Sequence, residues 1–283
     1  MPPIDGWALW ASLGVLGLLI GSFLNVVIHR LPQMMERRWA TECAELRSET
    51  TDTTSDTAAA RYDLVQPAST CPHCGHTIRW FENIPVLSYV WLKGRCSACH
   101  APISWRYPLV ELLTALVFAA LAWRWGASLH TLALCGFAAA LIALTWIDWD
   151  TTLLPDDITL PLVWAGLLVA ALQWGPVTLP DAFWGAVAGY GSLWSIYWLF
   201  KLVTGKEGMG YGDFKLLAAI GAWLGWQALL PVILVASIGG TVVGLVLKMR
   251  AELREDGYVP FGPFLAVGGL ALALAPQLAD WIR

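Results

Sequence analysis

Long apolar runs separated by short polar stretches dominate the chain, and the first run lies close to its start. Residues 7–28 are almost all apolar, and about 20 such residues are enough for a helix to cross a bilayer. We expect this first helix to end at residues 29–32. From residue 107 onward, apolar runs follow one another closely. They predict spans near residues 108–125, 130–147, 158–174, 182–203, 214–227, 228–248 and 260–280.

The pattern therefore predicts an all-α polytopic membrane protein with about eight transmembrane helices. It leaves open whether residues 214–248 form two spans, one long tilted helix or a re-entrant hairpin. Composition agrees, because 57% of the residues are hydrophobic and only 13% are charged, against roughly 25% charged in soluble domains. This composition predicts the lipid bilayer as a partner. The 17 Lys and Arg residues form no long basic run, so we expect no nucleic-acid partner.

One polar segment interrupts the apolar pattern and divides the chain into residues 1–32, 33–106 and 107–283. The middle segment is the part expected to lie in water. Within it, residues 40–66 are rich in Ser, Thr, Ala and Asp, a composition that cannot bury a core, so we expect this stretch to be mobile.

The basic residues are unevenly distributed between the two ends of the expected spans. Most lie in residues 30–106 or in the loops near 201–215 and 248–254, whereas the opposite side holds only Arg124 and Arg283. Because cytoplasmic loops carry the excess of Lys and Arg, the large polar segment is predicted to be cytoplasmic, with both termini on the other side.

Two acids, Asp148 and Asp213, are then expected at the same depth on the cytoplasmic face. Two carboxylates close together in a partly apolar site share a proton, which suits an aspartic protease: one Asp activates water and the other acts as an acid. Asp213 follows a glycine-rich loop containing Gly210 and Gly212, which indicates unusual backbone shape or close approach. Alternatively, Asp213 only complements a helix dipole. We interpret Asp150, Asp156 and Asp157 as solvated or capping residues.

Four cysteines form two Cys-x-x-Cys pairs, Cys71 with Cys74 and Cys96 with Cys99, separated by 21 residues. Each pair can offer two thiolates to one tetrahedral Zn²⁺, and a four-thiolate site has no open position, so the ion would be structural. The alternative is that these cysteines are reduced and free.

Two polar residues near the membrane segments have two interpretations each. Asn25 can join helices by a hydrogen bond or contact a cofactor, and Glu111 can pair with Arg106 or line a polar cavity. Residues 260–263 (Pro-Phe-Gly-Pro) are interpreted as setting the start of the last span.

In chain order, these motifs resemble those of type IV prepilin peptidases, the GxGD class of integral-membrane aspartic proteases. The matching segments are GSFLNVVIHRLP at residues 21–32, ENIPVLSY at 82–89, RYPLVE at 106–111, the four cysteines, Asp148 with LPD at 154–156, and GYGD at 210–213. The resemblance runs from about residue 7 to residue 270 and omits mainly the polar stretch.

The resemblance implies that Asp148 and Asp213 are the catalytic pair of an intramembrane endopeptidase. Such an enzyme removes leader peptides from type IV prepilins and pseudopilins, for pilus assembly or type II secretion, at the cytoplasmic face of the bacterial inner membrane. The large loop with its cysteine pairs further implies the bifunctional form, which N-methylates the new N-terminal residue with S-adenosylmethionine. No residue in the sequence identifies the methyl-donor site.

Two other classes of function stay open at this point. A non-catalytic assembly factor of a pilus or secretion machine would use the cysteine segment for docking, and would tolerate Asn at position 148 or 213. A proton-coupled transporter would relay protons through its intramembrane acids, but it predicts inverted-repeat symmetry, which is not visible in the sequence.

Overall fold

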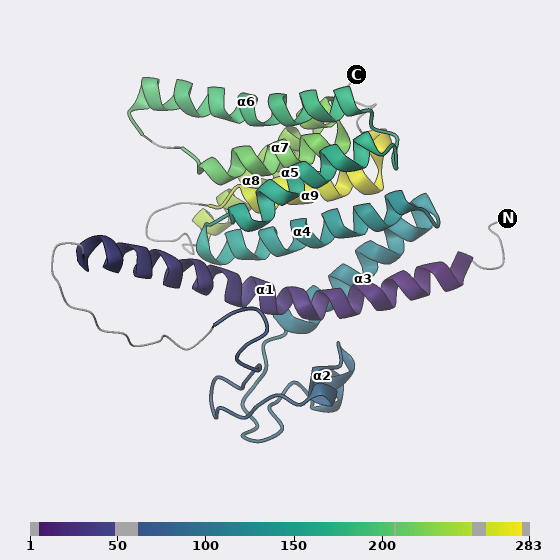
Figure 1. The fold of residues 1–283 in the computed structure, drawn as a ribbon, viewed down its shortest axis with the longest axis vertical. Helices are drawn as coiled ribbons and strands as arrows, with labels where there is room; N and C mark the ends of the chain where they lie inside the picture. The colour runs from purple at the N-terminus through teal and green to yellow at the C-terminus, as the bar shows by residue number, and fades with distance from the viewer. Residues whose placement is uncertain (1–5, 49–61, 207, 251–258, 279–283) are drawn as a thin grey trace. The chain divides into compact units, whose positions relative to one another are not determined.

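A computed structural model of the chain describes residues 6–48, 62–206, 208–250 and 259–278 (Figure 1). It divides into two compact units, one built from residues 15–115 and a larger one from the described parts of residues 1–14 and 116–283. Within the described ranges, every regular element is helical, apart from two isolated β-bridges. The α-helices are α1 (Gly6–Ser48), α2 (Leu87–Trp91), α3 (Arg106–Trp125), α4 (Leu129–Thr151), α5 (Asp156–Ala171), α6 (Leu179–Thr204), α7 (Tyr211–Leu224), α8 (Leu229–Met249) and α9 (Gly262–Leu274).

The all-helical prediction is confirmed, and each expected span corresponds to a helix. By length and apolar composition, four helical segments are able to cross a membrane: α1, α3, α4, and α8 with the turn before it. The predicted number of eight spans is not established, because α5, α7 and α9 have only 16, 14 and 13 residues, and α6, with 26 residues, is not among the four helices that are both long and apolar enough. At 1.5 Å per residue, α7 is about 21 Å long, shorter than a hydrocarbon core of about 30 Å.

The predicted end of the first helix is wrong. Helix α1 continues through Pro32 to Ser48, although an internal proline removes a helical hydrogen bond. Tertiary contacts stabilise the extension: the Tyr62 hydroxyl donates to Gln33 Oε1 over 2.8 Å, and the Arg37 guanidinium lies 3.7 Å from the centre of the Tyr62 ring. The predicted mobile stretch is thus helical over residues 40–48, while residues 49–61 lie outside the described part.

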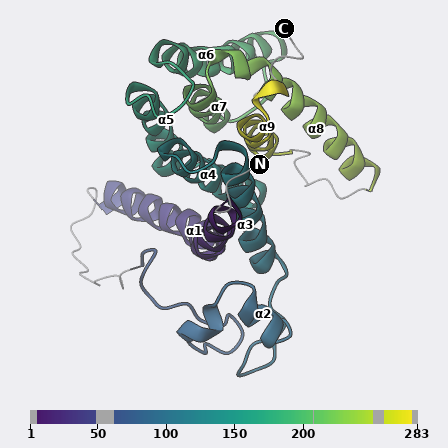
Figure 2. The ribbon, with the colours of Figure 1, turned by 90° about the vertical axis from the view of Figure 1, so that its right-hand side faces the viewer.

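Helix α7 is the centre of the larger unit. It packs against α5, α6 and α9, which surround it when the helices are seen nearly end-on (Figure 2). Its side chains are buried almost all the way round, as expected for a helix that is apolar on every face. Gly221 on α7 lies directly against Gly185 on α6, so the two backbones touch where any side chain would collide.

Residues 214–248 form two separate helices, which excludes one long tilted helix and leaves two spans or a re-entrant hairpin. The break lies at Gly225, whose φ of +82° suits glycine and ends α7. Asp181 at the start of α6 fixes the following turn, because its Oδ1 accepts hydrogen bonds from Trp226 Nε1 and Gln227 Nε2.

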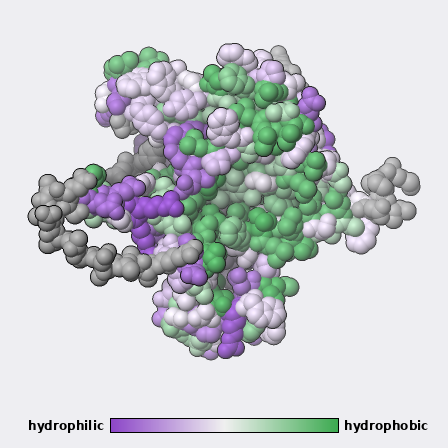
Figure 3. Space-filling model, in the orientation of Figure 1, coloured by the Kyte–Doolittle hydropathy of each residue, from purple (hydrophilic) through white to green (hydrophobic). Residues whose placement is uncertain are grey.

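Apolar side chains cover much of the visible face of the helices in the larger unit (Figure 3). Large hydrophobic residues of α5, α6 and α8 are exposed, among them Trp164, Leu199 and Ile238. A continuous exposed apolar surface of this kind indicates contact with lipid.

Candidate active site and metal centre

Asp148 and Asp213 come together inside the larger unit. Asp148 lies in the last turn of α4 and Asp213 in the first turn of α7, with only 4% and 3% of their surfaces exposed. The carboxylates are close enough for their charges to interact unfavourably. The structure therefore brings together two acids that are separated by 65 positions in the sequence, in an environment where both cannot easily be ionised.

Two glycines and one leucine enclose the pair of acids. An ideal Cβ at Gly212 would lie 2.7 Å from Leu154 Cβ, and one at Gly262 would lie 2.5 Å from Asp148 Oδ2 and 3.2 Å from Leu154 Cδ1. The missing side chains thus allow the start of α7 to approach Leu154 and the start of α9 to approach both Leu154 and Asp148. Gly262 was not identified from the sequence as a site residue, although its position between Phe261 and Pro263 marked a special backbone segment.

The glycine loop has a less unusual backbone than predicted. Gly210 is the N-cap of α7 with an ordinary extended conformation, φ −82° and ψ 154°, and space for a side chain is open there. Close approach, the other reason for a glycine, applies at Gly212. Within the loop, Glu207 lies outside the described residues.

Contacts from neighbouring elements fix the start of α7. Tyr211 and Phe214 pack on Tyr197 of α6, with ring centres 5.2 and 5.6 Å apart. Lys215 Nζ lies 2.7 Å from each carboxylate oxygen of Asp156 on α5. The predicted capping role of Asp156 or Asp157 is wrong, because Pro155 is the N-cap of α5 and both acids lie in the first helical turn.

The four predicted metal ligands form one cluster in the smaller unit. The Sγ atoms of Cys71, Cys74, Cys96 and Cys99 all lie within 4.8 Å of one another, and those of Cys71 and Cys99 are 3.8 Å apart. Four thiolates bound at about 2.3 Å to a tetrahedral ion are separated by about 3.8 Å. The cluster thus has the donor set and the spacing that a tetrahedral metal ion requires.

The two Cys-x-x-Cys segments have the same backbone fold. Residue five of each loop is left-handed, Gly75 at φ +71° and His100 at φ +59°. In each loop, its N–H donates to the carbonyl of the first cysteine, over 2.9 and 3.0 Å. Backbone N–H groups of His73 and Cys74 also face the Cys71 sulfur and lower the pKa of that thiol to about 7. This favours the thiolate form of Cys71, whereas hydrogen bonding to the neighbouring thiols, Cys99 first, raises the pKa of Cys74 to about 12.

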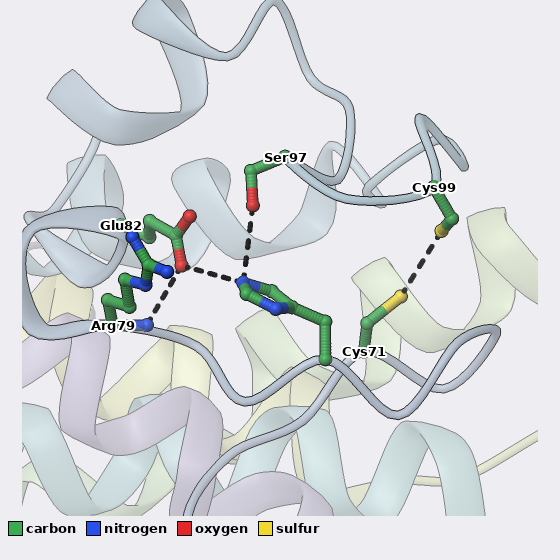
Figure 4. A network of polar contacts seen from close by, with 6 residues as sticks. Cys71, Arg79, Glu82, Ser97 and Cys99 are labelled. Atoms are coloured by element: carbon green, nitrogen blue, oxygen red, sulfur yellow. Dashed lines mark hydrogen bonds and ion pairs between the residues drawn. The ribbon is translucent and has the colours of Figure 1, made fainter.

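A polar network joins the two cysteine loops to the adjacent 3-10 turn, residues 80–83 (Figure 4). Glu82 Oε2 accepts from the Arg79 N–H over 2.8 Å and lies 3.2 Å from His76 Nε2, which is 3.3 Å from Ser97 Oγ. The hydrogen bonds, the Arg79 N–H first, lower the pKa of Glu82 from its usual 4.5 to about 2. This stabilisation is present above about pH 4.5 and is lost as the pH falls toward 2.

Asn25 and Glu111 tie the elements of the smaller unit together. Asn25 Nδ2 donates to the Tyr107 carbonyl over 3.1 Å, joining α1 to α3. Glu111 Oε2 accepts from the Val86 N–H over 2.7 Å, and Val86 has a φ of +60°, rare for a β-branched residue. These contacts favour the packing interpretation of Asn25. Glu111 binds the cysteine-containing segment to α3, a role that the sequence did not suggest.

Comparisons with known proteins agree with the geometry. Residues 15–125 match the bacterial peptidase A24 N-terminal domain, and residues 135–245, which include both acids, match the type IV leader peptidase family. Over 276 residues, the chain is 52% identical to a prepilin leader peptidase/N-methyltransferase of Aeromonas hydrophila, covering 97% of this chain and 94% of that protein.

Relatives with the same name in two other bacteria are equally similar. The protein of Burkholderia pseudomallei strain 1026b is 54% identical over 91% of this chain and 82% of its own length, and that of Pseudomonas aeruginosa is 51% identical over 93% and 90%. No solved structure matches the chain. Identity of this extent over nearly the whole length shows that the chain belongs to the type IV leader peptidase family.

Proposed function

We propose that this protein is a membrane-embedded aspartic endopeptidase that removes the leader peptides of type IV prepilins and pseudopilins, and that it then methylates the new N-terminal residue. The observation that carries the proposal is the pair of buried carboxylates, Asp148 and Asp213, brought together from α4 and α7. The names of its relatives support the same two activities.

The pair can perform peptide hydrolysis with one shared proton. The ionised Asp takes a proton from water, whose oxygen attacks the scissile carbonyl carbon, while the protonated Asp donates to the carbonyl oxygen. When the tetrahedral intermediate collapses, the C–N bond breaks and the leaving nitrogen takes the proton that one Asp had gained from water. A hydroxyl of the intermediate returns its proton to the other Asp as the carbonyl re-forms, which restores the single shared proton. Burial of two neighbouring carboxyls favours a neutral form of one of them. The close approach of Gly262 limits where the Asp148 carboxylate can lie.

Zn²⁺ is the ion that best fits the four-cysteine cluster, and its role would be structural. All four ligand positions of a tetrahedral ion would be occupied by sulfur, so the ion would supply folding energy and no open coordination position. The methyl donor would be S-adenosylmethionine. We assign no residue to it: Asn25 Nδ2 and Glu111 Oε2 already bind the protein backbone, and no contact among the described residues points to a donor site.

In the membrane, the proposed arrangement is a multi-pass protein of the bacterial inner membrane with about eight spans, including the shorter helices α5, α7 and α9. The distribution of Lys and Arg supports a cytoplasmic position for the cysteine-containing segment and for the acids. A prepilin leader would then be cut on the side where the prepilin is synthesised.

The test is leader removal from a prepilin by the purified protein in liposomes, followed by product mass. Asp148→Asn and Asp213→Asn should each lower the cleavage rate by about 1,000-fold or more, because neither half of the pair works alone. Asp150→Asn is the matched control, an exposed acid on the same helix. Wild-type product should gain one methyl mass only when S-adenosylmethionine is added.

The alternatives predict different results. If either Asn variant cleaves at the wild-type rate, the pair is not catalytic. The hypothesis that the protein is a non-catalytic assembly factor is then favoured. A transporter would instead show proton flux without product. An Asn variant that loses cleavage because it does not fold would have a lowered melting temperature. The Asp150→Asn control should keep the wild-type melting temperature.

A further inference from the structure

The short helix α2 of the smaller unit exposes three apolar side chains. Leu87, Val90 and Trp91 are 68%, 67% and 80% exposed. Their spacing of i, i+3 and i+4 places all three on one face of the helix. Single exposed apolar residues are common on protein surfaces. Three adjacent ones form a patch, and such a patch indicates contact with another molecule or with lipid rather than with water alone.

The depth of this face follows from contacts within the same unit. The N–H of Val86, the residue just before α2, donates to Glu111 of α3. Glu111 lies opposite Gly21 of α1, where an ideal Cβ would be 2.7 Å from Glu111 Cα. Gly21 comes eight residues before His29, which follows the apolar run of α1. At 1.5 Å per residue, the backbone of Glu111 therefore lies beside a point on α1 about 12 Å before the end of that run, and Val86 lies within one Glu side chain of it.

Side chains at this depth meet lipid wherever no protein covers them. The exposed residues Leu112 and Leu113 of α3 follow directly after Glu111. The start of α2 is thus bound to a membrane-length helix at a level where that helix exposes apolar side chains. Water at this level would have to replace hydrocarbon, which the neighbouring apolar side chains do not favour.

Cationic side chains adjoin the same face. An open groove of about 570 Å³ is lined by Trp91, Lys93, Arg95 and His100, among others. Lys93 and Arg95 are exposed. Trp at the boundary between headgroups and acyl chains, with Lys or Arg reaching toward phosphate, is the usual composition of a membrane interface.

We propose that α2 is inserted into the bilayer that the chain spans. Leu87, Val90 and Trp91 contact acyl chains beneath the headgroups, and Lys93 and Arg95 bind the phosphate of an anionic phospholipid in the adjoining groove. The cysteine-containing module is then held at the membrane from two sides, by the bond between Val86 and Glu111 and by lipid.

The full-length protein, with p-benzoylphenylalanine at position 90, is reconstituted in vesicles of phosphatidylglycerol and phosphatidylethanolamine and irradiated. Position 65 provides the matched control. Val65 is also an exposed valine, 80% exposed, but its turn is bound by Arg30, beyond the apolar run. Peptide mass spectrometry should find phospholipid adducts at least tenfold more often at position 90 than at position 65.

Equal adduct yields at the two positions would overturn the proposal. A second result would also overturn it. If an added prepilin formed adducts with position 90 in place of the lipid adducts, the face would be a substrate-docking surface. Trp91 provides a second labelling position, where one aromatic group replaces another, and it should give the same contrast if the change at Val90 disturbs folding.

The headgroup contact is tested separately. In the protein labelled at position 90 and otherwise unchanged, the fraction of adducts formed with phosphatidylglycerol should be several-fold higher than the fraction of phosphatidylglycerol in the vesicles. Lys93→Gln combined with Arg95→Gln should abolish this excess while leaving the total lipid adducts unchanged. An excess that persists in the double variant would overturn the assignment of these two cations.

Discussion

The two units of this protein are stabilised in different ways. In the smaller unit, buried apolar side chains of the helices lie on α1 and α3. Among the described residues between 62 and 105, which we call the cysteine module, Cys71 and Cys96 are the only buried side chains of the hydrophobic class. The larger unit has a continuous core in which α4, α7 and α9 bury most of their side chains. The cysteine module has little apolar core and four clustered thiols that can bind a metal ion, whereas the larger unit depends on many weak contacts at high packing density.

This difference is reflected in where each unit carries chemistry. Dense packing in the larger unit buries Asp148 and Asp213 and holds them close together. The smaller unit has polar contacts, left-handed residues and exposed aromatics around a ligand cluster. We therefore expect the helical unit to tolerate metal loss and the cysteine module to tolerate changes in helix packing. Four experiments examine this comparison, in order of decreasing expected effect.

Metal removal should separate the two units most clearly. Structural zinc contributes on the order of 10 kcal/mol to the folding of small domains. A strong chelator under reducing conditions, or Cys99→Ser, should therefore unfold the module and expose residues 71–105 to protease, while α4–α9 stay resistant. Limited proteolysis in detergent with mass mapping measures this. If both units became sensitive together, the independence of the two would be disproved.

Gly221→Ala should affect only the helical unit. The added methyl group would collide with the backbone of Gly185, and a collision with backbone in a packed core costs about 3 kcal/mol. The melting temperature of the helical unit should fall by several degrees, with metal content unchanged. Gly191→Ala on α6, where space is open, should leave the melting temperature equal or slightly higher. Equal melting temperatures for the two variants would contradict the close packing of α6 and α7.

Gly262→Ala should separate activity from stability within the helical unit. Its methyl group would displace the Asp148 carboxylate, and a misplacement of about 1 Å can lower a catalytic rate by about 100-fold. Leader cleavage measured with saturating substrate should show this loss in kcat, with little change in melting temperature. Gly136→Ala, on the helix that carries Asp148 but with open space around it, is the control and should cleave normally. Full activity of Gly262→Ala would remove Gly262 from the site.

The smallest effect concerns the two cysteine loops. Gly75→Ala places a side chain at a φ of +71°, which costs about 1 kcal/mol, whereas His100→Gly relieves the same conformation in the second loop. Gly75→Ala should release metal at a lower chelator concentration than wild type, and His100→Gly should not. Metal release followed with a colorimetric indicator gives the comparison. Similar weakening by both changes would show that the loops are not equivalent.

The membrane helices and the metal cluster were predictable from the sequence because their signals are local. Long apolar runs predict helices whatever packs beside them, and two Cys-x-x-Cys pairs are typical of a metal site. The unusual pair of acids was identified because a span count places Asp148 and Asp213 at one membrane face. Their catalytic role stays a prediction, although the structure brings the two carboxylates together.

Only the tertiary structure decided the details that depend on neighbours far away in sequence. Helix α1 passes Pro32 because Tyr62 contacts its extension. Gly262 belongs to the site because α9 approaches Asp148, and Glu111 binds Val86 across 25 positions. A local pattern encodes the propensity of a segment, whereas the contact that overrides or uses that propensity exists only after the chain has folded.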